Sequence, residues 1–373
     1  MKKNIGVVSY NIYGNFTNYG SALQSWALHQ AIEKIGGCFP VLVDYCPEIL
    51  LDKDPLNPFK NMWDKGDEAK RMCELTLPAI KENYYKFDAF YTNYFKRTKK
   101  KYTSKNFAEV IGDEELSGFV CGSDTIFCMD EFGFDDGFFA NYECMKKHSV
   151  AYAASFGDPT LSEENCAILN QRLQNFNALG LRENQMISYV KENIRVPIQR
   201  VVDPTLLLTT NDYDNIAISE RIEEDPYLLY YSRRYSPAME DYVEKLAKKK
   251  GWKIVEISLR AINAEKGHKM MYEAGVEEFL SLIKHAEYVV TNSFHGLIFS
   301  VQYKRPFVVF SREQCNNKID EILNLFGLKD RMLVTGTEGF QETINYDEVH
   351  ERIKSERTKS IDFLKREINE YLG

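Results

Sequence analysis

Short apolar runs alternate along the chain with longer segments whose apolar residues recur at helical spacing. Continuous apolar runs bounded by turn residues are typical of buried strands, whereas a period near 3.6 residues is typical of one buried helix face. Strands are predicted at residues 5–10, 40–45, 118–121, 149–156, 178–181, 227–232, 253–257, 288–291 and 307–310. Helices are predicted at residues 21–35, 68–95, 162–175, 239–249, 276–285, 297–303, 319–326 and 349–372.

This alternation predicts an α/β fold made of right-handed β-α-β crossovers and parallel sheets. The chain has 373 residues, which exceeds the usual size of a single hydrophobic core, so two domains are expected. We predict two Rossmann-like β/α domains that face each other across a cleft. The first comprises residues 1–208, with a helical insertion at about 51–101 over its sheet, and the second comprises residues 209–345. Between them, residues 207–224 are predicted to be a linker, and residues 346–373 a terminal helix that returns to the first domain.

Charge and composition narrow the classes of partner. The formal net charge is −8 and neither half carries a broad basic excess, which argues against a nucleic-acid-binding protein. Aromatic residues make up 13% of the chain, with 23 Tyr and 23 Phe, as expected for a large core and for surfaces that stack on sugars. The basic run at residues 96–101 is the exception. It is either a solvated connector or a contact for a membrane surface or a polyanion.

The cysteines and the apolar runs indicate a cytoplasmic protein. The eight cysteines form no C-x-x-C pair and show no Cys/His spacing of a metal site, so no metal is predicted and reduced thiols are expected. The first apolar run, residues 5–10, is too short for the core of a signal peptide. No run approaches the ~20 apolar residues of a transmembrane helix. We therefore expect the protein either free in the cytoplasm or at the inner face of the membrane.

One strand-to-helix corner has the composition of a ligand site. The turn Asn292-Ser293-Phe294-His295-Gly296 lies between the predicted strand at 288–291 and the helix at 297–303. Open α/β sheets bind ligands at such carboxyl ends of strands, and the unpaired N–H groups of the following helix attract anions. His295 is therefore placed to meet a phosphate or a carboxylate. The alternative is a helix cap followed by a packed histidine.

Several segments, taken in order, resemble one family. They are NYGSALQSWAL, VCGSDTIF, VAYAASFG, LGLRENQ, VVDPTLLL and YVVTNSFHGLIFS. Each is weak alone, but the ordered set over about residues 4–331 resembles the polysaccharide pyruvyl transferase family. The resemblance implies a two-domain, glycosyltransferase-B-like architecture. It also implies transfer of pyruvate from phosphoenolpyruvate to a sugar of a surface or capsular polysaccharide precursor, as a ketal, with release of phosphate.

The resemblance implies a donor site around His295. The enol methylene carbon of the donor must be protonated, and a histidine is the natural acid near neutral pH. Arg182 matches the family's arginine and suits bidentate binding of an anion; its alternative is an ion pair with Glu183 or Asp203. A further cation is expected after the strand at 307–310. The donor-binding candidates are Arg182, Ser293, His295, Gly296, and either Arg312 or Lys318, between which spacing does not decide.

The acceptor site is implied to lie in the first domain. Asp124 would bind an acceptor hydroxyl or take its proton, unless it only caps a helix. Gly20 fits either a close approach of the backbone to a ligand or a plain helix start. Many relatives carry an acidic residue where this chain has Ser21. The acceptor-binding candidates are Asn18, Tyr19, Gly20, Ser21, Ser123, Asp124 and Ser155.

The implied partners are phosphoenolpyruvate and a sugar or lipid-linked oligosaccharide, with no nucleic acid, cofactor or metal. Two other functions fit the same architecture. One is a nucleotide-sugar glycosyltransferase, although no ribose- or pyrophosphate-binding element stands out in the second half. The other is a non-catalytic sugar-binding homologue, because Ser21 departs from the family pattern. Release of phosphate from phosphoenolpyruvate, without a nucleotide, would separate the transferase from both.

Overall fold

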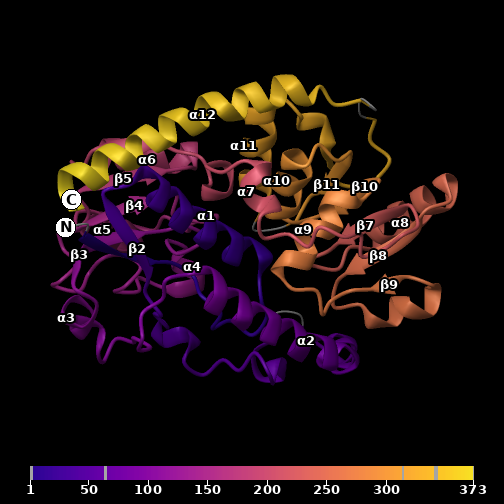
Figure 1. The fold of residues 1–373 in the computed structure, drawn as a ribbon, viewed down its shortest axis with the longest axis horizontal. Helices are drawn as coiled ribbons and strands as arrows, with labels where there is room; N and C mark the ends of the chain where they lie inside the picture. Colours follow the sequence, from indigo (N-terminus) through magenta and orange to yellow (C-terminus); the bar gives the residue numbers. More distant parts are fainter. Residues whose placement is uncertain (1–2, 63–64, 313–314, 340–342, 373) are drawn as a thin grey trace.

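The computed structural model describes residues 3–62, 65–312, 315–339 and 343–372. Figure 1 shows two α/β lobes side by side, with the long C-terminal helix running along one edge of the molecule. Each lobe contains a six-stranded parallel sheet, in the orders β2-β1-β3-β4-β5-β6 and β12-β11-β10-β7-β8-β9. The predicted α/β fold with two parallel sheets is confirmed.

The strands of the first sheet are β1 (Lys3–Val8), β2 (Cys38–Leu42), β3 (Leu116–Cys121), β4 (Ser149–Tyr152), β5 (Ala178–Leu181) and β6 (Ile198–Arg200). Those of the second are β7 (Tyr227–Tyr231), β8 (Lys253–Ile257), β9 (Lys269–Met270), β10 (Tyr288–Thr291), β11 (Phe307–Phe310) and β12 (Met332–Leu333). Strands β5, β7 and β11 are apolar along their whole length, as is usual where helices cover both faces of a parallel sheet. In β7 and β11 every residue is buried.

The α-helices are α1 (Tyr19–Ile35), α2 (Asp67–Tyr94), α3 (Val110–Glu114), α4 (Met129–Phe132), α5 (Glu163–Leu173), α6 (Asn184–Asn193), α7 (Thr210–Asp214), α8 (Pro237–Lys250), α9 (Val276–His285), α10 (Phe294–Gln302), α11 (Asn316–Phe326) and α12 (Tyr346–Glu367). The sequence pattern missed α6, and the segment predicted to be a linker contains α7. It also missed β6, β9 and β12. These three strands have only two or three residues and lie at or beside the sheet edges, so they produce no apolar run.

The C-terminal helix connects the two lobes. At its start, His350 Nε2 lies 3.0 Å from the carbonyl of Val301 in α10. Further along, the Ser360 hydroxyl accepts a hydrogen bond from the N–H of Val202 at 3.0 Å, and Phe363 is fully buried. The chain ends in a π-helical turn, Ile368–Leu372, that contacts β3 and β4 of the first sheet. The helix thus begins on the second lobe and ends on the first (Figure 1).

The helical insertion also touches both lobes, whereas the sequence predicted a cover for the first sheet alone. Helix α2 packs on α1 and reaches α9 of the second lobe. The side-chain amide of Asn83 donates to the carbonyl of Ala274 at 2.5 Å, and Lys86 pairs with Glu278 at 2.9 Å. These contacts fix one lobe against the other where α2 reaches from the first lobe toward the second (Figure 1).

The basic run at residues 96–101 is largely engaged within the fold. Arg97 pairs with Asp44 at 2.8 Å, and Lys100 pairs with Asp113 at 2.9 Å. The Lys101 ammonium lies 4.1 Å from the centre of the Tyr13 ring. This placement favours the interpretation of the run as a connector. No helix in the described part of the chain combines the length and the apolarity needed to cross a membrane.

The buried histidine of α1 should make stability depend on pH. His29 is 4% exposed and packs edge-on against Phe95, and burial lowers its pKa to about 4. As the pH falls below the ordinary pKa of 6.5, His29 takes up a proton in the unfolded chain but stays neutral in the folded protein. Stability is full above that value and is lost as the pH falls toward 4. We expect the free energy of unfolding to drop by about 2 kcal/mol between pH 8 and pH 5 through this group.

The measurement is denaturant unfolding of the parent and of His29→Leu across this pH range. The difference between the two free energies of unfolding should vary with pH by that amount. His148→Leu, at an exposed position, is the control and should leave the pH dependence unchanged. Parallel pH curves for the parent and His29→Leu would contradict the assignment.

Candidate active site

Helix α10 begins three residues earlier than predicted, so His295 lies in its first turn. Ser293 is the N-cap, and its hydroxyl accepts a hydrogen bond from the N–H of Gly296 at 3.2 Å. Gly296 leaves no room for a side chain, because a Cβ there would lie 2.6 Å from Thr291 Oγ1. The structure thus gives Ser293 and Gly296 roles in starting the helix. The first N–H groups of the helix, those of Phe294 and His295, lack intrahelical acceptors, and N–H groups of this kind attract anions.

A buried carboxylate joins Arg182 to His295. Asp203 Oδ2 lies 2.5 Å from Arg182 Nη1 and 3.5 Å from His295 Nε2. Burial would raise the pKa of Asp203, but the charges of His295 and Arg182 and the hydroxyl of Thr205 outweigh it and hold the pKa well below its usual range. Arg182 also pairs with Glu183 at 3.2 Å. Both ion pairs considered as alternatives for Arg182 are therefore present, and its charge is compensated by two carboxylates.

The backbone of Gly20, from the first lobe, lies against the Nδ1 edge of the His295 imidazole, whereas Asp203 lies near Nε2. A Cβ at Gly20 would lie 1.9 Å from His295 Nδ1, a distance at which atoms overlap. The N–H of Gly20 donates to the side chain of Asn18, which is the N-cap of α1, at 3.0 Å. The sequence left either a close approach to a ligand or a plain helix start for Gly20; in the structure its backbone lies against His295 across the cleft. The amino ends of α1 and α10 meet here.

Tyr19 lies in the contact between the lobes. Its hydroxyl donates to the carbonyl of Ala274 at 2.7 Å, and its ring stacks on Phe279 at 4.1 Å between centroids. The side chain is 4% exposed. This placement favours packing between the lobes over direct contact with a sugar.

Asp124 lies on the first-lobe side of the cleft, and two hydrogen bonds hold its carboxylate. Its Oδ2 accepts a hydrogen bond from the hydroxyl of Ser21, and its Oδ1 accepts one from the N–H of Thr125 at 2.8 Å. Ser21 and Asp124, both acceptor candidates, are thus brought together.

Ser123 and Ser155 are fully buried, and both bond to the main chain. The Ser123 hydroxyl donates to the carbonyl of Ala153 at 2.9 Å, and Ser155 Oγ accepts from the N–H of Gly157 at 3.2 Å. These two serines shape the corner without facing it.

Of the two further donor candidates, Lys318 shares a pocket with Arg182. This pocket lies between the lobes and is also lined by Asp203 and Phe294. In the described part of the chain, the Lys318 ammonium makes no ion pair. Arg312 donates its backbone N–H to Asn316 Oδ1 at 2.7 Å, and its buried Nε has no hydrogen-bond partner among the described residues. The geometry favours Lys318 over Arg312, because Lys318 lines the pocket that Arg182 lines.

Arg233 is a cation of the cleft that the sequence analysis missed. It follows β7, which pairs with β10, and its N–H donates to Asn292 Oδ1 at 2.8 Å. Its Nη1 donates to the carbonyl of Thr17 on the first lobe at 3.0 Å, while its other guanidinium nitrogens bond no described residue. Burial would lower the pKa of Arg233, but nearby tyrosines and Asp124 raise it on balance. Its place just past a strand end, in YLLYYSRR, is the signal that could have identified it.

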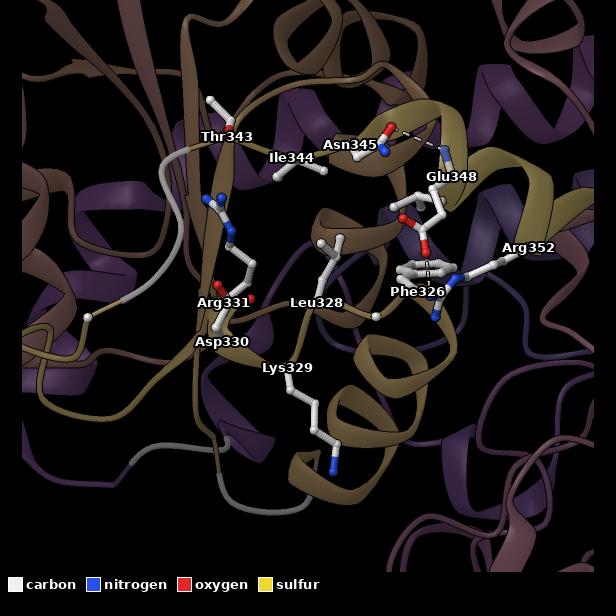
Figure 2. A pocket seen from close by; sticks show the side chains of 13 residues that line it. Phe326, Leu328, Lys329, Asp330, Arg331, Thr343, Ile344, Asn345, Glu348 and Arg352 are labelled. Carbon is white, nitrogen blue, oxygen red and sulfur yellow. Dashed lines mark hydrogen bonds and ion pairs between the residues drawn. The ribbon is translucent and has the colours of Figure 1, made fainter.

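One cavity lies away from these residues. It has a volume of about 620 Å³ and is bounded by the end of α11, the turn Lys329–Arg331 and the start of α12 (Figure 2). Arg331 directly precedes β12, and its Nη1 donates to the carbonyl of Phe307 at the start of β11 at 3.3 Å, so the cavity is at the amino-terminal edge of the second sheet. Ligands of such sheets bind at the opposite, carboxyl edge, where His295 lies. Nowhere among the described residues do three or more His, Cys, Asp or Glu side chains cluster as metal ligands would.

Comparisons with known proteins agree with this architecture. The sequence profile of the family described as polysaccharide pyruvyl transferase matches residues 18–314. No curated protein sequence matches the chain. Among solved structures, the Staphylococcus aureus MnaA-UDP co-structure is 14% identical with a TM-score of 0.51, covering 100% of this chain and 97% of that chain. A protein assigned as a UDP-N-acetylglucosamine 2-epimerase from Listeria monocytogenes is 13% identical with a TM-score of 0.50, covering 100% and 92%. At these identities the likeness is one of fold, and the glycosyltransferase-B-like prediction is confirmed.

Proposed function

Because the chain belongs to the polysaccharide pyruvyl transferase family, we propose that it transfers pyruvate from phosphoenolpyruvate to a sugar as a ketal and releases phosphate. The acceptor is a sugar of a polysaccharide precursor, linked to a nucleotide or a lipid and presented in the cytoplasm or at the inner face of the membrane. The observation that carries the proposal is the placement of His295, which lies at the amino end of α10 between Asp203 and Gly20.

His295 is the proton donor in this proposal. Addition of a proton to the methylene carbon turns phosphoenolpyruvate into an electrophile that hydroxyl groups attack. The ionised carboxylate of Asp203, close to Nε2, attracts a positively charged imidazole and opposes the helix end, which repels one. Nδ1, on the edge of the ring that faces Gly20, is then the nitrogen that delivers the proton. Asp203 acts as the positioning residue for the ring.

The anionic groups of the donor need cations other than Arg182. Two carboxylates already compensate Arg182, so its main contribution is to hold Asp203 in place. Arg233 and Lys318 have no carboxylate partner among the described residues and approach the cleft from the second lobe. Together with the free N–H groups of α10, they supply the charge that a phosphate and a carboxylate require.

The test uses purified protein, phosphoenolpyruvate and a panel of nucleotide-linked and lipid-linked hexoses and N-acetylhexosamines. We expect release of inorganic phosphate that requires both phosphoenolpyruvate and one class of acceptor. Release of a nucleoside diphosphate from a nucleotide sugar, with no consumption of phosphoenolpyruvate, would favour the glycosyltransferase alternative. The MnaA co-structure contains UDP, but MnaA resembles the present chain in fold alone. Its UDP therefore does not favour the glycosyltransferase alternative for the present chain.

The reaction should not need a metal ion. Arginine, lysine and a helix end can neutralise the donor's anions without one. We expect turnover with phosphoenolpyruvate to be unchanged after treatment with EDTA and gel filtration. Loss of turnover that one divalent ion restores would contradict this expectation.

Replacement of Arg233 should weaken the donor complex. Loss of a hydrogen bond to a charged group costs about 1.5–3 kcal/mol, so Arg233→Gln should raise KM for phosphoenolpyruvate by ~10- to 100-fold with a smaller effect on kcat. Arg233→Lys should recover part of the loss because it keeps the charge without the planar fork. Arg195→Gln, on the exposed surface of the first lobe, is the control. An unchanged KM in Arg233→Gln would exclude the donor-binding role.

A further inference from the structure

We propose that Glu131 takes a proton from an acceptor hydroxyl, and that Asp124 orients the acceptor beside it. This inference rests on the proposed pyruvyl transfer and adds a residue to it. Glu131 lies in α4, six residues after Thr125 of the Asp124 corner, and is close enough to Lys318 and Arg233 of the second lobe for their charges to act on it. On the sequence alone, Asp124 is a candidate for this base, for a residue that binds an acceptor hydroxyl, or for a helix cap.

The stoichiometry of a ketal requires a proton acceptor on the sugar side. Two acceptor hydroxyls form two C–O bonds to the central carbon of phosphoenolpyruvate, and the bond from that carbon to the phosphate oxygen breaks with its electron pair on the phosphate. The methylene carbon gains one proton from His295. Two hydroxyl protons are released in exchange: one restores the proton of His295, and the other leaves with the phosphate as HPO₄²⁻. The hydroxyl protons must therefore pass to a group beside the acceptor.

Asp124 is a poor candidate to accept the hydroxyl protons. Both of its oxygens accept hydrogen bonds within the protein, Oδ2 from Ser21 and Oδ1 from the N–H of Thr125. These bonds fix the carboxylate and occupy a lone pair on each of its oxygens. Such a group suits the orientation of a sugar hydroxyl better than removal of its proton.

Glu131 has the opposite character. Its Oε2 accepts one bond, from Thr125 Oγ1 at 3.1 Å, while Oε1 accepts none from a described residue, and the side chain is partly exposed. Thr125 thus contacts both carboxylates, through its N–H and its hydroxyl. The ring of Tyr10 packs on Phe132 at 5.5 Å between centroids, and the charge of Glu131 contributes to the raised pKa of Tyr10.

Burial and the charged groups around Glu131 bring its pKa into the range that suits proton transfer near neutral pH. Burial and the charge of Asp124 raise the pKa of Glu131 to about 7, against the hydrogen bond of Thr125 and the charges of Lys318 and Arg233, which lower it. A base is most effective when its pKa lies near the working pH. Cys128 and Tyr10 also lie near Glu131, and both stay neutral because their own pKa values are raised.

The test is the pH dependence of turnover in Glu131→Gln and Asp124→Asn. The parent should lose activity below an apparent pKa near 7, where Glu131 becomes protonated. Glu131→Gln should lower kcat by ~10²-fold, the usual scale for loss of a general base, and should remove this acidic limb. Asp124→Asn should keep the limb but shift it to lower pH, because the charge that raises the pKa of Glu131 is gone. If Glu131 and Asp124 had only structural roles, the acidic limb would stay at the parental pH in both variants.

Asp130→Asn, at an exposed position in the same helix, is the matched control and should behave as the parent does. Thermal unfolding of each variant checks the fold, and binding of phosphoenolpyruvate by calorimetry should be retained in Glu131→Gln. If the parent forms the ketal and Glu131→Gln turns over at the parental rate with the same acidic limb, this inference fails while the proposed function stands. If the parent forms no ketal from phosphoenolpyruvate, the proposed function fails and takes the inference with it.

Discussion

His295→Gln is expected to lower turnover by ~10²-fold or more while leaving most of the affinity for phosphoenolpyruvate. Glutamine fills a similar space and can donate a hydrogen bond, but it cannot deliver a proton at neutral pH. The cations Arg233 and Lys318 and the N–H groups of α10 remain to hold the donor. Turnover is measured as phosphate release at saturating donor, and affinity by calorimetry.

Two further variants complete this experiment. His295→Ala should lose turnover to a similar degree and more affinity, since it also removes the hydrogen-bond donor. His148→Gln, at an exposed position, should match the parent. If His295→Gln keeps the parental turnover, His295 is not the proton donor. It would then only anchor the donor or pack in the interface between the lobes.

Gly20→Ala is expected to lower turnover as severely, although the change adds one methyl group. The new Cβ would lie 1.9 Å from His295 Nδ1, so either the imidazole turns away from Asp203 or the lobes separate. A displacement of about 1 Å in a reacting group costs ~10²-fold in rate. The readout is kcat at saturating phosphoenolpyruvate, together with the melting temperature.

Gly112→Ala is the matched control, because it also adds a methyl group to a helical glycine, in α3, where a Cβ would meet nothing within 4 Å. It should keep parental turnover. If Gly20→Ala also keeps parental turnover and stability, the contact between α1 and α10 is looser than described, and the placement of His295 by the first lobe is wrong.

The sequence predicted those features that depend on short-range pattern. Strands β5, β8, β10 and β11 and helix α9 have the predicted ends, because apolar runs bounded by turn residues define them directly. The carboxyl ends of parallel strands collect at one edge, so the corners that carry Asp124, Arg182 and His295 could be assigned to the cleft before their geometry was known.

The features that the sequence did not predict depend on contacts between distant segments. Nothing in the local pattern around Gly20 shows that it lies against His295, since the two are brought together only when the lobes assemble. The same holds for Asp203, which appeared only as an alternative partner of Arg182 and holds both Arg182 and His295 in the structure. Arg233 and Glu131 gain their charged neighbours in the same way.

The most direct test of the central claim is the mass of the acceptor after reaction with phosphoenolpyruvate in D₂O. The account predicts an acceptor heavier by one pyruvate less one water, with one solvent deuterium in the new methyl group, because the proton comes from an exchangeable acid. His295→Gln should form this product at least ~10²-fold more slowly. An acceptor that gains an enolpyruvyl group without deuterium, or that gains nothing while phosphoenolpyruvate is intact, would contradict the account.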